Sequence, residues 1–271
     1  MTSFHARHLL SGAAITTLSL LLPLLAAAWS QLTVFGDSLS DSGNVGRFTY
    51  DAASHPLYDE ILAQHLNQTL LPSSQGGSNY AAGGAVAVPA LNPQYNSQDQ
   101  VDRYLVAGGG RADGNGLYIY WIGGNDLTAA AADPLNAVQV IDNSARSAAD
   151  QVSRRLAAGA GTVVVPTVPN VWATPALLQA ILQPLGPVAE PAMAALFQSL
   201  SSVTASDRAA REQAIEAAFR QAADQITAIP QVREAIARQL FAAWQLLSDT
   251  AATLTDRYNQ LEEQGLVATG G

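Results

Sequence analysis

Three short apolar runs constrain the fold of this chain most strongly: QLTVFG at residues 31–36, LYIYWIG at 117–123 and TVVVPTV at 162–168. The second run is apolar on both faces, as expected for a central strand of a parallel sheet. Segments with helical spacing separate the runs, including 59–70 and an arginine-rich stretch at 137–158. This alternation predicts an α/β protein with three α/β/α layers and a doubly wound parallel sheet.

Polar, glycine-rich residues gather where the predicted strands end. FGDSLSDSGN (35–44) follows the first strand, GGSNYAAGGA (76–85) contains a short extended stretch, and IGGNDL (122–127) ends the 117–123 strand. Each segment alone is ordinary turn chemistry. Ligands of open α/β sheets bind at the carboxyl ends of the strands, so three such segments at one edge predict a functional site.

Charge and composition exclude several classes of function. The net charge is −9, which disfavours nucleic acid and anionic membrane surfaces as partners. The chain has no cysteine, so disulfides, thiolate catalysis and thiolate metal sites are excluded. The histidines and carboxylates show no metal-ligand spacing, and we expect neither a metal nor a cofactor.

The first 28 residues resemble a secretory leader. They contain Arg7, an apolar run at 18–25 and the small residues Ala26 to Ala28, which suit cleavage. A membrane anchor is the alternative, but polar residues and Pro23 interrupt the run, which is short for a span. We expect the leader to be cleaved, no transmembrane span in the mature chain, and a secreted or extracytoplasmic location in the periplasm or at the cell surface.

The three strand-end segments together resemble the sequence blocks of the GDSL (SGNH) family of esterases and lipases. FGDSLSDSGN is similar to its nucleophile block, SNYAAGGA to its glycine block and YIYWIGGNDL to its G-x-N-D block, in the family's order. PNVWATPAL (169–177) is similar to a Thr-Pro segment of its bacterial secreted members. The resemblance implies a flavodoxin-like fold and a small acyl-ester or lipid substrate. Some secreted members also carry a C-terminal outer-membrane barrel, which is possible here in a longer parent.

The resemblance also implies site residues. Ser38, placed where a strand gives way to a helix, would be the nucleophile. The Ser38 amide, a glycine amide and the Asn125 side chain would form the oxyanion hole. We prefer Gly84 to Gly83 as that glycine, counting from Asn79, although such a pair is also common in turns.

The chain departs from the family at the catalytic base. The family supplies it from a C-terminal D-x-x-H block, and no histidine of this chain follows position 65; the four are His5, His8, His55 and His65. His65 has the spacing of an ordinary helix residue. His55 lies in a loop that could border the site, but we do not expect it to replace the base. We expect Asp37 and Asp126 to hold backbone amides rather than to transfer protons.

The last residues suggest where the block would lie. We predict a helix at 255–264, ended by Gly265, and the start of a fifth strand at 266–269, so that the hydrolase domain, 29–271, is C-terminally incomplete. Residues 176–254 are predicted to form a helical insertion, either a lid or a partner surface.

Two functions stay open at this point. The chain is either a secreted serine ester hydrolase that acts through a Ser38 acyl-enzyme, and is inactive as given if it needs the absent Asp-His block, or a non-catalytic extracytoplasmic module that binds acylated or glycosidic ligands.

Overall fold

The computed structural model describes residues 29–47, 54–170, 181–191, 193, 194, 198 and 208–269. They form two compact units, one of Met1–Thr167 with Tyr258–Gly271 and one of Val168–Arg257, and each is described by itself. The expected leader and most of the Thr-Pro segment lie outside the described residues.

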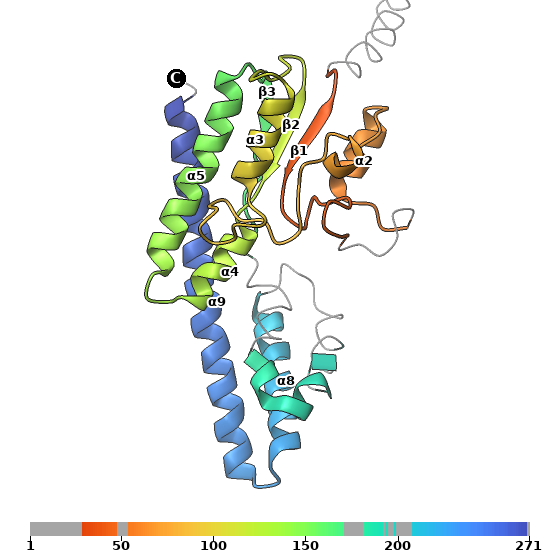
Figure 1. Ribbon diagram of the computed structural model, residues 1–271. Helices are drawn as coiled ribbons and strands as arrows, with labels where there is room; N and C mark the ends of the chain where they lie inside the picture. The colour runs from red at the N-terminus through yellow and green to blue at the C-terminus, as the bar shows by residue number, and fades with distance from the viewer. Residues whose placement is uncertain are drawn as a thin grey trace, which may run out of the picture. The chain divides into compact units, whose positions relative to one another are not determined.

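The first unit contains a parallel sheet of three strands in the order β1-β2-β3 (Figure 1). The strands are β1 (Leu32–Gly36), β2 (Leu117–Trp121) and β3 (Thr162–Val164), and all three apolar runs are therefore confirmed as strands. Gly36 pairs with Trp121 in the register of β1 and β2, so the loops that follow these two strands leave the sheet side by side.

The extended stretch at residues 78–82 lies along the other edge of β1. The Val34 amide donates to Ser78 O at 3.1 Å, and the Tyr80 amide donates to Val34 O at 2.7 Å. After β1 the chain therefore first passes along one edge of β1, at residues 78–82, and then crosses to form β2 along the opposite edge of β1. The point where strand order reverses, between β1 and β2, is where open α/β sheets bind their ligands.

Among the described residues, four α-helices lie wholly in this unit, α2 (Tyr58–His65), α3 (Ser97–Ala107), α4 (Gly124–Ala132) and α5 (Ala137–Ala157), and the end of α9 (Pro230–Thr269) belongs to it as well. α2 and the residue that follows it pack on one face of the sheet through Leu62 and Leu66, whereas α3 and α5 cover the other face (Figure 1). α2 and α5 were expected from apolar spacing, and α3 and α4 were not. The short 3-10 turn η1 (Ser73–Gln75) precedes the glycine block.

An arginine is buried in the core under α5. The Arg155 guanidinium lies 4.6 Å from the ring centre of Phe35 and 4.4 Å from that of Tyr120. Burial lowers the pKa of Arg155 to about 10. Because an aromatic face attracts a cation, the two rings compensate part of the cost of burying this charge.

The predicted start of a fifth strand at residues 266–269 is wrong. These residues belong to α9 (Pro230–Thr269), which continues through Gly265. A Cβ on Gly265 would lie 2.5 Å from the Ala149 Cβ on α5. Gly265 therefore permits close approach of two helices, and the glycine that we interpreted as a helix stop has a packing role instead.

The second unit is helical among its described residues, with η3 (Gln183–Val188), α8 (Arg208–Ile226) and the part of α9 before Tyr258. Its core consists of apolar side chains from these segments: Leu182, Ile215, Ala218, Phe219 and Ala222, with Leu240, Phe241 and Trp244 against them. The bounds of the insertion, about 176 and 254, stay a prediction. No helix in the described part of the chain has the length and apolarity of a membrane span.

We expect Gly36→Ala to destabilise the first unit. A Cβ at Gly36 would lie 2.5 Å from the backbone oxygen of Trp121, and the sheet register leaves neither strand free to move. The cost should be about 1–3 kcal/mol of unfolding free energy, as for other overpacked sites. Gly46→Ala is the matched control, because no atom lies within 4 Å of its added Cβ. Urea unfolding of both variants tests this, and equal midpoints would contradict it.

Candidate active site

Ser38 lies in the turn directly after β1. The turn spans residues 37–40 and is closed by a hydrogen bond from the Ser40 amide to Asp37 O at 3.1 Å. Ser38 is half-buried at the carboxyl edge of the sheet. The expected helix directly after the strand is not there, because residues 37–47 form turns and bends.

Asp37 and Asp126 hold backbone amides, as expected. Asp37 Oδ1 accepts from the Leu39 amide at 3.0 Å, and the two Asp126 oxygens accept from the Ala87 amide at 3.0 and 3.1 Å. Burial raises the pKa of Asp37 to about 6 and the pKa of Asp126 to about 6. Both carboxylates fix the loops that carry the site.

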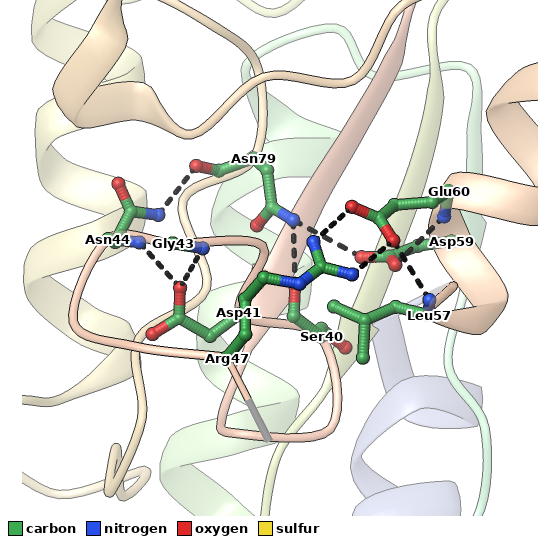
Figure 2. A network of polar contacts seen from close by, with 9 residues as sticks. All are labelled: Ser40, Asp41, Gly43, Asn44, Arg47, Leu57, Asp59, Glu60 and Asn79. Carbon is green, nitrogen blue, oxygen red and sulfur yellow. Dashed lines mark hydrogen bonds and ion pairs between the residues drawn. The ribbon is translucent and has the colours of Figure 1, made fainter. Parts of the chain in front are cut away.

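Asp41 organises the loop after Ser38, and we did not predict this role. Its side chain is fully buried and accepts hydrogen bonds from five backbone amides. Four belong to its own loop, at 2.6–3.3 Å, and Figure 2 shows those of Gly43 and Asn44. The fifth, at 2.7 Å, comes from Gly83 in the glycine block. The D-x-G-N spacing typical of an Asx turn was the available signal.

Two asparagines join the same loop to the glycine block. The Asn44 Nδ2 donates to Asn79 O at 2.8 Å and to Ala81 O at 2.7 Å. The buried Asn79 Nδ2 donates to Ser40 O at 2.7 Å and to Asp59 Oδ2 at 3.2 Å, as Figure 2 shows. Asn79 therefore holds the Ser38 turn through Ser40 O, and Asn44 holds the loop that follows this turn against the glycine block.

The geometry separates Gly83 from Gly84. The Gly83 amide is taken by Asp41, whereas within the described residues nothing accepts from the Gly84 amide. Gly84 has a positive φ of 76°, a conformation that favours glycine. Its amide therefore remains available to a ligand, in agreement with the choice of Gly84, although its part in an oxyanion hole stays a prediction.

Asn125 lies in the first turn of α4, not in an irregular loop. Its Nδ2 donates to Ala85 O at 2.8 Å, which joins the G-x-N-D segment to the residue after Gly84. A carboxamide nitrogen carries two hydrogens, so one remains for a second acceptor. The structure thus connects the segments of Asn125 and Gly84 directly, and Asp41 connects the Gly84 segment to the loop of Ser38.

The two histidines outside the expected leader make only local contacts. His55 is exposed, with Nδ1 2.9 Å from Ser54 Oγ. His65 is also exposed, with Nδ1 2.8 Å from Ile61 O of its own helix, which agrees with the interpretation as an ordinary helix residue. As far as the structure describes the chain, no side chain accepts from the Ser38 hydroxyl.

Among the described residues, no three or more histidine, cysteine, aspartate or glutamate side chains lie close enough together to hold a metal ion. The arrangement offers backbone and side-chain amide donors at the edge of the sheet, and neither described histidine is in hydrogen-bond contact with the Ser38 hydroxyl.

Comparisons with known proteins point to one family. The model of the GDSL-like Lipase/Acylhydrolase family matches residues 32–260. "Lipase 1" of Photorhabdus luminescens is 40% identical over 250 residues. The matched region covers 91% of this chain and 39% of that relative, so the chain spans about two-fifths of the length of the curated relative that it matches.

Proposed function

Because the chain belongs to the GDSL-like lipase/acylhydrolase family, we propose that it forms the hydrolase region of a carboxylic ester hydrolase whose nucleophile is Ser38. The observation that carries this proposal is the distribution of amide hydrogen bonds. Of the described amides around the site, those of Leu39 and Gly83 have acceptors, while those of Ser38 and Gly84 have none.

The proposed mechanism uses these donors in acyl transfer. The Ser38 oxygen attacks the ester carbonyl, and the carbonyl oxygen becomes an oxyanion that accepts from the Ser38 amide, the Gly84 amide and Asn125 Nδ2. The tetrahedral intermediate then releases the alcohol and leaves an acyl group on Ser38, which water removes. Because Asp41 and Asn79 fix the donors beforehand, little reorganisation is needed when the charge develops.

The base and its acidic partner belong to this proposal too. The family resemblance implies a D-x-x-H pair, and we propose that the proton of Ser38 is taken by such a pair outside the described residues. The order of residues 78–82, β1, β2 and β3 supports a flavodoxin-like, doubly wound core of the SGNH type. The leader-like first 28 residues support a secreted or extracytoplasmic location.

We expect the nucleophile to be identified by hydrolysis of p-nitrophenyl butyrate and by labelling with a fluorophosphonate. Ser38→Ala should abolish both, and Asn125→Ala should lower the hydrolysis rate roughly a hundredfold to a thousandfold, as loss of one oxyanion donor does. Ser54→Ala, an exposed serine beside His55, is the matched control and should change neither. Hydrolysis that survives Ser38→Ala would refute the assignment.

A non-catalytic binding module is the second candidate, and the lack of a base in contact with Ser38 among the described residues favours it. An oxyanion hole without a working base retains only about a thousandfold to ten-thousandfold catalysis over water. Hydrolysis at background in a protein that includes a D-x-x-H pair, with no fluorophosphonate label on Ser38 and with an acyl ligand still bound, would support this candidate. Loss of hydrolysis in His55→Ala would instead identify His55 as the base.

A further inference from the structure

A pocket of about 410 Å³ opens beside the first half of α3, next to the proposed active site. Four segments of the first unit line it: the loop after β1 with Asn44, η1 with Ser74, the glycine block with Ala82, and residues 94–103 with Gln94, Tyr95, Gln100 and Arg103. Its volume lies in the range of small-molecule sites. We call it the α3 pocket. Neither Ser38 nor Asn125 lines it, so it is separate from the acyl-transfer centre.

Buried hydrogen bonds tie the α3 pocket to the backbone of the site. Gln100 is buried, and its side chain both accepts from the Gly36 amide at 2.9 Å and donates to Gly36 O at 2.8 Å. Beside the pocket, Asn92 donates to Gly84 O at 3.0 Å and accepts from the Gln94 and Tyr95 amides at 3.2 Å. The wall of the pocket is therefore held in place by the segments that carry Ser38 and Gly84.

Several exposed polar groups of the α3 pocket remain available to a ligand. Over the described part of the chain, the Arg103 guanidinium makes only one long hydrogen bond, from Nε to Asp99 O at 3.4 Å. Gln94 donates to Tyr95 Oη at 2.9 Å, which leaves its side-chain oxygen without a donor. The pocket thus offers guanidinium donors, an amide acceptor and a phenol hydroxyl that does both.

The donors and acceptors that line the α3 pocket suit some classes of ligand better than others. An acyl chain would meet few aliphatic side chains, because Val45 and Ala82 are the aliphatic residues of the lining, and the rest of its apolar surface comes from polar or aromatic residues such as Tyr95. An anion is also disfavoured, because the carboxylate of Asp99 lines the same pocket; the charge of Asp102, which lies there too, is offset by its pair with Arg154 at 2.5 Å. Vicinal hydroxyl groups donate and accept at once, and they carry no charge that these carboxylates would repel.

We propose that the α3 pocket binds a neutral polyhydroxyl group, a sugar ring or a polyol. The group comes either from free carbohydrate or from the sugar part of an amphiphile. In both cases Arg103 and Gln94 hydrogen-bond the hydroxyls, and the Tyr95 ring contacts the carbon skeleton. The proposal concerns binding alone and holds whether or not Ser38 turns over an ester.

The test measures binding of three probes to the whole chain by saturation-transfer NMR and calorimetry: glycerol, methyl β-glucoside and octyl β-glucoside. We expect Arg103→Ala and Gln94→Ala each to weaken binding, for Arg103 by roughly tenfold or more, because hydrogen bonds from a charged donor are the stronger ones. Arg111→Ala is the matched control, an exposed arginine outside the lining, and it should bind as the parent does.

The probes also separate the two sources. Binding of glycerol or methyl glucoside that is lost in Arg103→Ala supports the pocket with free carbohydrate as its ligand. If octyl glucoside alone binds, and its binding is lost in Arg103→Ala, the result supports the proposal with an amphiphile as the ligand of the pocket. No binding of any probe, or binding that neither Arg103→Ala nor Gln94→Ala weakens, would overturn the proposal.

Discussion

Replacement of Asp41 by alanine is expected to cost the protein about 3–5 kcal/mol of unfolding free energy and to abolish ester hydrolysis. Five backbone amides would lose their acceptor at once, and a hydrogen bond to a charged group contributes about 1.5–3 kcal/mol. The estimate stays below the sum because the loop can partly turn its amides toward water. Without the bond to Gly83, the glycine block would no longer be held against the Ser38 loop.

One further variant tests whether the negative charge of Asp41 is needed in addition to its side-chain oxygens, and a second serves as a control. Asp41→Asn keeps one acceptor oxygen but places a donor against the amides, so we expect an intermediate loss. Asp150→Ala is the matched control, because Asp150 lies exposed on α5, and its effect should stay within about 0.5 kcal/mol. Urea unfolding and p-nitrophenyl butyrate hydrolysis are the measurements. A stable Asp41→Ala protein with full hydrolysis would show that the loop does not depend on this carboxylate.

The stability of the protein is expected to fall as the pH rises from about 4.5 to 8. Four buried carboxyl groups of the first unit have raised pKa values, and burial is the main cause for each. The pKa is raised to about 6 for Asp37 and for Asp126, to about 7 for Asp59 and to about 8 for Glu262. A carboxyl with a raised pKa in the folded state binds its proton more tightly there than in the unfolded chain. Its stabilising effect is therefore complete below its ordinary pKa and is lost as the pH passes its folded pKa.

Glu262 should contribute most to this pH dependence. It is buried on α9, no hydrogen-bond partner of its Oε1 exists in the described structure, and the charge of Asp126 adds to the effect of burial. Its pKa rises from 4.5 to about 8, and one pKa unit corresponds to about 1.4 kcal/mol, so the loss is on the order of 3–5 kcal/mol. We expect Glu262→Gln to be more stable than the parent at pH 8.5 and close to it at pH 5.

Unfolding midpoints of the parent, Glu262→Gln and Glu263→Gln across this pH range are the measurement. Glu263 is the exposed neighbour on the same helix, so its replacement should leave the pH profile unchanged. A parent chain whose midpoint is constant from pH 5 to 8.5, or a Glu262→Gln variant with the profile of the parent, would contradict the burial of an ionisable carboxyl at this position.

Local patterns explain what could be predicted of the fold. The strands were predicted because a buried parallel strand needs a continuous apolar run, and the sequence shows such a run directly. α5 was predicted as the arginine-rich helical stretch between two apolar runs, and the structure confirms it over 21 residues. α4 was not, since the residues Gly-Gly-Asn-Asp at its start are equally typical of a turn, and its burial against α5 decides for the helix.

The segment after Gly265 shows the limit most clearly. Leu266 to Thr269 is short, and Val267 and Thr269 favour a strand, so local preference predicted the wrong structure. A helix forms there because α9 packs against α5, where Gly265 leaves room for Ala149. That contact joins residues more than a hundred positions apart, and no local pattern contains it.

The sequence by itself determined the family of this chain and the residue types of the candidate site: a serine after the first strand, a glycine pair and an asparagine in the order typical of that family. Only the tertiary structure decided which amides remain available. It assigns the Gly83 amide to Asp41 and leaves the Gly84 amide without an acceptor in the described residues. The physical reason is that residue types are local properties, whereas a hydrogen-bond donor is free or taken according to which distant acceptor the fold brings to it.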